Sequence, residues 1–450
     1  MTMAKKGSFF WGAYNALFSV GYVLMLPRFL ARMAKRGGYR RRFLERFGIY
    51  DDDVKAKTRG ASRIWIHAVS VGEISAALSL VREIRRQDPS ARFIVSTTTS
   101  TGRAVAEGRM DPQDALVYYP ADFPPAVRKA LDTLNPGALV LTESELWPNM
   151  LRMAQERGIP TILFNGRISE SSMRGYRKIR PVMRAVMSGF AACLAQSEED
   201  AGRLAELGAP SDRTRALASA KYDAAPQASA MPPDLAAFFS AAGVVAGTPV
   251  LLGASTWPGE EDALAGIYGR LREAFPGLRL ALVPRHAERR REVAAGLRRL
   301  GFCCVLRSAG IPERVRGNEI LVVDTTGELA AAYQMATVVV IGKTFLSRGG
   351  QNMIEPAALG KAVVVGPHVS NFETIVKDFL ADGSMIQAGD LAELEQAVRR
   401  LLAEPRTRDE LGRRAAMSVA RRRGAVAESA RVILDVLRQR GSSGQSATPA

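Results

Sequence analysis

The chain has 450 residues, of which 47% are hydrophobic and 24% are charged, as in folded globular proteins. Because one compact core rarely extends over such a length, we expect two domains with appendages. The formal net charge of +17 predicts an anionic partner: nucleic acid, an anionic membrane or a phosphorylated substrate. Nucleic acid is not expected, since no tract interleaves aromatic with basic residues and no nucleic-acid motif is present.

The cysteines and histidines exclude two further classes of site. The three cysteines lie in apolar, strand-like contexts and form no disulfide framework, which favours a reducing compartment. The three histidines lie far apart in the sequence, so no metal site is expected.

The N-terminal part contains one long apolar segment, residues 8–27, and a dense basic run follows it at residues 28–46. This order predicts a membrane anchor, spanning or lying flat, with the basic run and the next domain on the cytoplasmic side. A buried helix and a cleaved signal peptide are the rival interpretations, but no small-x-small cleavage site precedes the basic run. Residues 1–47 are therefore assigned to a membrane anchor helix and a basic juxtamembrane segment.

From residue 63 onward, short apolar runs alternate with helical periodicity, which predicts an α/β protein with parallel sheets. The expected strands are 63–69, 92–99, 115–120, 138–144, 161–167, 192–197, 249–256, 279–285, 302–307, 319–326, 337–344 and 361–367. They form two Rossmann-like, doubly wound halves of six strands each, which are expected to face a central cleft. The predicted segments are 48–222 for an N-terminal domain, 223–236 for a linker, 237–436 for a C-terminal domain with terminal helices, and 437–450 for a disordered tail.

Residues 338–367 contain a glycine-rich turn between two apolar runs, and Glu355 lies in the helical stretch after the turn. Glycines let the backbone approach a ligand, and the first N–H groups of a helix attract anions. The Glu355 carboxylate is then placed to accept both hydroxyls of a ribose. An ordinary glycine-rich turn, with Glu355 as a first-turn dipole residue, explains the local pattern equally well.

Polar residues also follow the other predicted strands, at the edge where open α/β sheets bind ligands. Ser70 and Glu73 follow the first strand, although Ser-x-x-Glu is also a capping box, which the local pattern favours. Two carboxylates, a tryptophan and an asparagine lie in residues 143–149, and Arg285 follows a strand of the second half. Neither a Walker A loop nor a G-x-G-x-x-G fingerprint is present. The pattern predicts group transfer, with a nucleotide donor on the C-terminal half and a general base on the N-terminal half.

Nine segments occur in a fixed order along the chain. They are HAVSVGE (67–73), STTTSTG (96–102), ESELWPN (143–149), NGRIS (165–169), KYD (221–223), STWPGEE (255–261), VPRH (283–286), DTTGEL (324–329) and RGGQNMIEPA (348–357). Together they resemble the 3-deoxy-D-manno-octulosonic acid (Kdo) transferases, which are GT-B glycosyltransferases of lipopolysaccharide assembly. The matched segments span nearly all of the chain.

The resemblance implies an inverting, metal-independent transfer of Kdo from CMP-Kdo to the lipid A precursor lipid IVA, with no cofactor. It implies that Glu73 is the general base and that Glu143, Glu145 and Lys221 carry charge near the reacting centre. The acceptor is expected to contact Ser70, Gly72, Arg167 and Ser169. The CMP of the donor is expected to contact Pro284, Arg285, Thr326, Gly327, Glu328, Asn352, Met353, Ile354 and Glu355. The implied location is the cytoplasmic face of the inner membrane, whose anionic lipids, with lipid IVA, are the expected partners of the basic face.

Three positions depart from the usual pattern of the family. Gln351 stands where Gly-Gly-His-Asn has histidine, so it donates a hydrogen bond but carries no imidazolium charge. Lys343 stands within the usual Gly-Gly-Ser and adds a cation near the expected phosphate, and Ala220 replaces an asparagine before Lys221. Two alternatives remain open: a GT-B enzyme that uses another nucleotide sugar, such as UDP-GlcNAc, and a non-catalytic module that binds anionic lipid.

Overall fold

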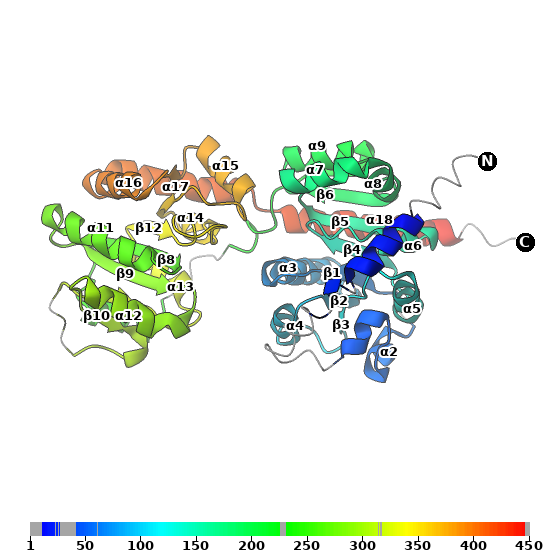
Figure 1. Ribbon diagram of the computed structural model, residues 1–450, viewed down its shortest axis with the longest axis horizontal. Helices are drawn as coiled ribbons and strands as arrows, with labels where there is room; N and C mark the ends of the chain where they lie inside the picture. Colours follow the sequence, from blue (N-terminus) through cyan, green and yellow to red (C-terminus); the bar gives the residue numbers. More distant parts are fainter. Residues whose placement is uncertain are drawn as a thin grey trace, which may run out of the picture. The chain divides into compact units, whose positions relative to one another are not determined.

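The computed structural model describes residues 11–22, 24, 25, 27, 42–60, 62–225, 231–313, 315 and 317–445. The chain divides into two compact units: unit 1 comprises Met1–Ala224 and Gly424–Ala450, and unit 2 comprises Ala225–Arg423. Each unit contains one seven-stranded sheet in which every recorded strand pair is parallel (Figure 1). The α/β class and the two doubly wound halves are therefore confirmed.

The sheet of unit 1 has the strand order β3-β2-β1-β4-β5-β6-β7. Its strands are β1 Ile64–His67, β2 Phe93–Thr97, β3 Ala115–Tyr118, β4 Ala138–Thr142, β5 Thr161–Gly166, β6 Phe190–Ala195 and β7 Thr214–Ala216. Chain order runs outward in both directions from the β1/β4 pair, where Ile66 lies opposite Val140. This topological switch point is where open α/β sheets bind their ligands, beyond the carboxyl ends of the strands.

Helices cover both faces of this sheet. They are α2 Asp52–Thr58, α3 Val71–Gln87, α4 Ser100–Glu107, α5 Pro124–Leu134, α6 Pro148–Glu156, α7 Glu170–Lys178, α8 Arg180–Met187, α9 Glu198–Glu206 and α18 Ala425–Gln445, with the 3₁₀ turns η1 Phe43–Phe47 and η2 Ser211–Arg213. Because successive strand side chains point to opposite faces, Trp65 packs with α5, α6 and α8. Its neighbour Ile66 packs on the other face with α3 and α18. Buried strands with two covered faces explain the unbroken apolar runs in the sequence.

The sheet of unit 2 has the order β10-β11-β9-β8-β12-β13-β14. Its strands are β8 Val250–Thr256, β9 Arg279–Pro284, β10 Cys304–Leu306, β11 Ile320–Val322, β12 Val338–Ile341, β13 Ala362–Val365 and β14 Ile386–Gln387. Its helices are α10 Pro233–Ala241, α11 Glu260–Ala274, α12 Arg290–Arg299, α13 Leu329–Ala332, α14 Ile354–Ala358, α15 Glu373–Ala381, α16 Leu391–Ala403 and α17 Pro405–Arg421, with η3 Ala287–Arg289, η4 Arg307–Ala309 and η5 Tyr333–Met335. The order reverses between β8 and β12, which repeats the plan of unit 1. All twelve predicted strands are present, whereas β7 and β14, one edge strand in each sheet, were not predicted.

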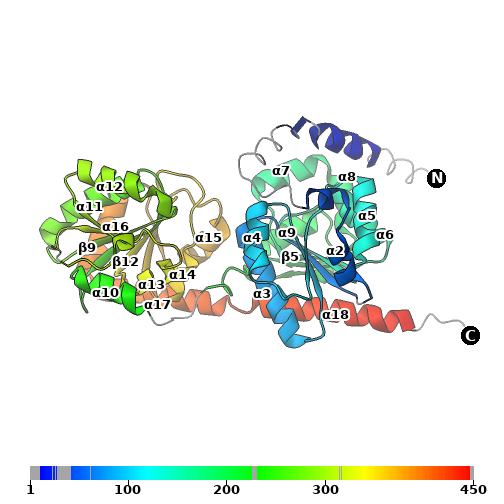
Figure 2. The same cartoon turned by 90° about the horizontal axis from the view of Figure 1, so that it is seen from below.

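The C-terminal helix belongs to unit 1, and this corrects the predicted boundary of the second domain. The predicted C-terminal domain, residues 237–436, included residues 424–436. In the structure these residues belong to α18, which runs along unit 1 beside α3 (Figure 2). The Asp223 carboxylate holds its start, because it accepts hydrogen bonds from the N–H groups of Gly424 (2.6 Å) and Val426 (2.8 Å).

The predicted bounds of the C-terminal tail and of the linker also differ from the structure. The predicted tail, residues 437–450, is helical as far as Gln445, and residues 446–450 lie outside the described part. The predicted linker, residues 223–236, contains the start of α10 at Pro233, while residues 226–230 lie outside the described part.

The apolar N-terminal segment is a helix at residues 11–22, 24, 25 and 27 and packs on unit 1. The hydroxyl of Tyr14 donates to Asp122 Oδ2 (2.8 Å), and Phe18 lies edge-on to Phe123 with ring centroids 5.2 Å apart. Among the described residues, no helix is both long and apolar enough to cross a bilayer. Residues 8–10, 23, 26 and 28–41, which carry the rest of the predicted anchor and most of the basic run, lie outside the described part.

Candidate active site

Glu73 lies in the first turn of α3, directly after β1, and its carboxylate is fixed by three hydrogen bonds. Oε1 accepts from the Ser70 hydroxyl (3.0 Å), while Oε2 accepts from Val69 N–H (2.8 Å) and from the Thr142 hydroxyl of β4 (3.3 Å). In return, Ser70 Oγ accepts from Glu73 N–H (3.2 Å). The capping box that the local pattern favoured is therefore present. The hydrogen bond from Thr142 is not part of a capping box. It joins Glu73 to the end of β4 and so places Glu73 at the β1/β4 switch point.

Glu143 follows β4 and has a left-handed backbone (φ 51°), a conformation that is costly for a residue with a side chain. Its Oε1 lies 3.4 Å from Asn165 Nδ2 and 3.9 Å from Lys221 Nζ. Burial raises the pKa of Glu143, and so do the charges of Glu73 and Glu145, while the Lys221 ammonium opposes the rise. Glu73, Glu145 and Lys221 thus all act electrostatically on Glu143, and the four residues form one cluster.

Glu145, the third carboxylate of this cluster, contacts Trp147 and His67. Its Oε2 accepts a hydrogen bond from the Trp147 indole N–H (2.9 Å) and lies 3.8 Å from Nε2 of His67. The His67 ring is fully buried and stacks on Tyr119 at 3.7 Å, and its Nδ1 lies 3.1 Å from the Ser96 hydroxyl. Within the described part of the chain, His67 Nε2 has no hydrogen-bond partner.

Asn165 is a site residue that the predicted set left out. It lies at the end of β5 with a left-handed backbone (φ 56°), and its Oδ1 accepts from Ala220 N–H (2.9 Å). Its own carbonyl accepts from the Gln196 amide (3.0 Å). Because Ala220 precedes Lys221, Asn165 fixes the loop that presents this lysine to Glu143. Its position in NGRIS, at the end of a buried strand, was the available signal.

The predicted acceptor residues fall into two kinds. Ser70 and Ser169 are N-caps, of α3 and α7 respectively, and Ser169 Oγ accepts from Ser172 N–H (3.1 Å). Arg167 lies next to the carboxylate cluster, since its N–H donates to Glu143 O (3.3 Å) and its charge lowers the pKa of Glu143. Gly72 is exposed in the first turn of α3.

In unit 2 the predicted donor residues lie at the end of β9, after β11 and at the start of α14. Glu355 Oε1 accepts from Asn352 Nδ2 (2.9 Å), and Asn352 Oδ1 accepts from Ile354 N–H (3.0 Å). Burial raises the pKa of Glu355, while the hydrogen bond from Asn352 and the charge of Arg285 oppose the rise. Arg285, which follows Pro284, therefore acts electrostatically on the Glu355 carboxylate.

In the segment after β11, the Glu328 side chain that was predicted to contact the donor is already bound by other residues of the protein. Glu328 pairs with Arg307 (3.0 Å) and accepts from the Thr325 hydroxyl, so its carboxylate is already bound. Thr326 and Gly327 are exposed, and Gly327 has a left-handed backbone (φ 92°). This turn offers a ligand its backbone and the Thr326 hydroxyl rather than a free carboxylate.

Glu260 is a second residue that the predicted set left out. It is 4% exposed, and it accepts hydrogen bonds from the N–H groups of Trp257 (2.9 Å), Lys343 (2.7 Å), Thr344 (3.2 Å) and Phe345 (3.3 Å). It therefore fixes the loop after β12. There Lys343 is left-handed (φ 60°), and its ammonium lies 4.3 Å from the Trp257 ring centroid.

The glycine-rich turn is present, but the helix after it is short, since α14 has five residues. Gly349 (φ 128°) and Gly350 (φ 81°) are left-handed, and a Cβ on Gly349 would lie 2.8 Å from Asn371 Nδ2. The turn thus needs glycine, as predicted, although α14 is too short to support a strong dipole. Met353 and Ile354 are buried, which makes them packing residues of this turn.

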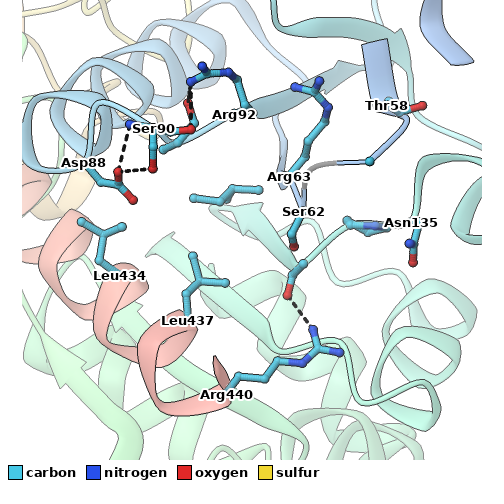
Figure 3. Close-up of a pocket in the computed structure, with 15 residues that line it drawn as sticks. Thr58, Ser62, Arg63, Asp88, Ser90, Arg92, Asn135, Leu434, Leu437 and Arg440 are labelled. Carbon is cyan, nitrogen blue, oxygen red and sulfur yellow. Dashed lines mark hydrogen bonds between the residues drawn. The ribbon is translucent and has the colours of Figure 1, made fainter. Parts of the chain in front are cut away.

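A cavity of unit 1 lies away from these residues. It has a volume of about 620 Å³ and is lined by residues that include Ser62, Arg63, Asp88, Leu437 and Arg440 (Figure 3). These residues precede β1 and β2 or belong to α18, so the cavity is at the amino edge of the sheet. None of the predicted site residues lines it.

Comparison with known proteins identifies the chain's relatives. Residues 41–224 match the family model described as 3-deoxy-D-manno-octulosonic-acid transferase (kdotransferase). The chain is 37% identical to a 3-deoxy-D-manno-octulosonic acid transferase of Bordetella pertussis, over 80% of this chain and 83% of that one. It is 28% identical to the enzyme of the same name from Haemophilus influenzae, over 94% of this chain and 97% of that one.

Among solved structures, UDP-GlcNAc 2-epimerase of Neisseria meningitidis aligns with 84% of this chain and 100% of its own at a TM-score of 0.55. At 11% identity this likeness concerns the fold alone, which is of the GT-B type. The sequence relationship is of a different order, because it combines high identity with coverage of most of both chains. The protein is therefore an enzyme that belongs to the 3-deoxy-D-manno-octulosonic acid transferase family.

Proposed function

We propose that this enzyme transfers Kdo from CMP-Kdo to the lipid A precursor lipid IVA, by an inverting displacement that needs no metal. The observation that carries the proposal is the cluster of Glu73, Glu143 and Glu145 with Lys221 at the carboxyl edge of unit 1. The pKa of Glu143 is raised by burial and by the charges of Glu73 and Glu145, while the Lys221 cation lowers it, and perturbed groups of this kind are typical of a reacting centre. Such a cluster is costly as a purely structural arrangement.

Glu73 is the proposed general base. An acceptor hydroxyl must lose its proton as its oxygen attacks the anomeric carbon. In the proposed step the proton passes to Glu73 and a C–O bond forms on the face opposite the leaving group. The bond to the phosphate oxygen breaks, and CMP leaves with its electron pair. The hydrogen bonds from Ser70, Val69 and Thr142 support this role, because they fix the carboxylate in one orientation.

Glu143 and Lys221 are proposed to receive the sugar. Kdo carries a carboxylate on its anomeric carbon, so its site must attract an anion. The Lys221 ammonium supplies this attraction. The raised pKa of Glu143 favours a protonated side chain, which does not repel the sugar carboxylate. Arg167, beside the same cluster, is proposed to attract a phosphate of the acceptor.

The CMP of the donor is proposed to bind unit 2. Arg285 is exposed after β9 and its charge lowers the pKa of Glu355, which supports a nucleotide that meets a cation with its phosphate and a carboxylate with its ribose. The exposed turn at Thr326 and Gly327 is proposed to contact the same nucleotide through its backbone. Of the other predicted donor residues, Asn352 supports the Glu355 carboxylate through its hydrogen bond, and Met353 and Ile354 are buried in the same turn.

The decisive experiment is a mass measurement of the products that the purified full-length protein forms from lipid IVA. CMP-Kdo and UDP-GlcNAc are supplied in separate reactions. We expect lipid IVA to gain the mass of Kdo units with CMP-Kdo only, together with release of CMP. Turnover with UDP-GlcNAc alone would replace the donor assignment, and lipid binding without turnover would support a non-catalytic module.

Membrane association is the second part of the proposal. The N-terminal helix turns Tyr14, Asn15 and Phe18 toward unit 1, whereas Leu17 (74% exposed) and Leu24 (72% exposed) point outward. We propose that this outward face lies flat in the cytoplasmic leaflet of the inner membrane, held by its anionic lipids. Flotation with phosphatidylglycerol-containing vesicles tests it. L17E/L24E should stay unbound, and binding equal to that of the unaltered protein would exclude this face.

A further inference from the structure

We propose that the N-terminal helix is also a positioning element of the active site. Through Phe18 and Tyr14 it fixes Trp147, and the Trp147 indole N–H in turn orients the Glu145 carboxylate. The inference rests on the proposed function for its catalytic consequence. It assigns the helix a task that remains when no membrane is present.

The first step is the contact between Trp147 and Glu145. The indole N–H donates to Glu145 Oε2 at 2.9 Å. Tyr119 lies against one side of Trp147, with ring centroids 6.2 Å apart, and is itself stacked on His67. The orientation of the indole therefore depends on neighbouring side chains as well as on its own backbone.

The second step joins Trp147 to the helix. Phe18 meets the indole edge-on, with centroids 6.4 Å apart and an interplanar angle of 87°. The same phenyl ring also contacts Phe123 at 5.2 Å. Phe18 thus fills the space between the two rings, and its removal leaves the indole free to rotate away from Glu145.

The third step is a polar latch at the same place. Trp147 is the N-cap of α6 and has no side-chain oxygen with which to cap it. Asp122 supplies that cap from a different loop, because its oxygens accept from the N–H groups of Asn149 (2.9 Å) and Met150 (2.8 Å). Asp122 also accepts the Tyr14 hydroxyl, and Asn149 Nδ2 donates to Asn15 Oδ1 (2.7 Å).

A simple anchor does not require this arrangement. A helix that only holds a protein at a bilayer needs an apolar outer face and a tether. This helix instead has an inner face that shares a buried carboxylate and an aromatic cluster with the start of α6. The start of α6 is also where Trp147 holds Glu145, so docking of the helix and the geometry of Glu145 depend on the same contacts.

The test compares four full-length variants with detergent-dispersed acceptor, so that membrane binding plays no part. W147F keeps the ring but removes the N–H donor, and F18A removes the brace. F18Y restores an aromatic ring, and L17A changes an exposed neighbour on the same helix. Losing a hydrogen bond to a charged group predicts a kcat about ten- to a hundredfold lower for W147F. The KM for CMP-Kdo should change little.

F18A should lower kcat in the same direction by a smaller factor, F18Y should recover most of the loss, and L17A should equal the unaltered protein. If Phe18 acts through Trp147, the double variant F18A/W147F is no slower than W147F. Multiplying effects, or an F18A variant with full kcat, would overturn the proposal.

A second measurement needs no activity. The chain has four tryptophans, so ¹⁵N-tryptophan labelling yields four indole N–H signals, and W147F identifies that of Trp147 by its loss. F18A should shift this signal and speed its hydrogen exchange, while L17A should leave it unchanged. An unmoved signal in F18A would refute the positioning role. Failure of the unaltered protein to transfer Kdo would refute the proposed function instead.

Discussion

The ammonium of Lys221 lies 3.9 Å from Oε1 of Glu143, a residue held in the left-handed backbone region at φ 51°. The two residues belong to different loops. Asn165 connects these loops, because it contacts Glu143 in one and Ala220, the neighbour of Lys221, in the other. Strained backbone of this kind persists only where the surroundings determine it fully, and it is concentrated at functional sites. The pair is therefore the first place to test the chemistry.

Lys221→Met should lower kcat/KM by roughly ten- to a hundredfold, the range expected for one lost interaction with a charged group. The pKa of Glu143 is raised by burial and held down by Lys221, so it should rise further without the ammonium. Because the protonated form of Glu143 is proposed to accept the sugar, the alkaline limb of the kcat/KM profile should then move to higher pH. Lys178→Met, at an exposed position of α7, is the matched control. An unaltered pH profile in Lys221→Met would exclude this coupling.

Glu73→Gln separates the capping role of Glu73 from its proposed role as a base. Glutamine at this position still completes the capping box, so the free energy of unfolding should change by less than about 1 kcal/mol. Loss of a general base should lower kcat by roughly 10²- to 10⁴-fold. Thermal unfolding, CMP binding by calorimetry and single-turnover transfer give the three readouts. Full activity in a folded Glu73→Gln variant would remove Glu73 as the base.

Glu260→Gln should loosen the loop after β12. The carboxylate accepts four backbone N–H groups, and an amide that presents its own N–H to some of them leaves those donors unpaired. We expect a loss of about 2–4 kcal/mol in the free energy of unfolding, with weaker CMP binding. Glu273→Gln, at an exposed position of the same helix, should change neither. Wild-type CMP affinity in Glu260→Gln would show that this loop does not serve the donor.

Asp122 should make stability pH-dependent. Burial raises the pKa of Asp122 to about 6, while its bonds to Asn149, Tyr14 and Met150 and the nearby Arg152 charge oppose the rise. The folded state therefore binds the proton more tightly than the unfolded state. The contribution of Asp122 is full below its unfolded pKa and is lost as pH rises toward 6, with a slope of at most about 1.4 kcal/mol per pH unit. Urea unfolding from pH 4 to 7, as the difference between the unaltered protein and Asp122→Ala, measures it. A difference that grows with pH would contradict the sign.

Most strands were predictable because they are short, unbroken apolar runs that are buried on both faces. β7 (Thr214–Ala216) and β14 (Ile386–Gln387) escaped because they are two or three residues long, lie at sheet edges and carry polar side chains. The periodicity of α18 correctly predicts a helix. It does not reveal which sheet that helix covers, since an apolar stripe such as Ile433 and Leu434 suits either core.

The site was predictable where a residue acts next to its own strand, as with Glu73 and Glu143. It was not predictable where the partner is distant in sequence. Glu260 serves a loop more than eighty positions later, and Trp147 depends on Phe18, so neither role follows from local spacing. The backbone strain at Glu143, Asn165 and Lys343 is likewise invisible in the sequence, because none of these residues is a glycine.

The return of α18 to unit 1 has a consequence for how the chain is made. Unit 2 is one uninterrupted stretch, so a ribosome releases all of it before the last segment of unit 1 appears. The domain that starts synthesis first is therefore completed last, and until then the α3 face of its core is without Ala430, Ile433 and Leu434. Nascent chains should thus expose an apolar surface on the older domain. Removing the final helix should make the N-terminal half, rather than the adjacent one, dependent on chaperones.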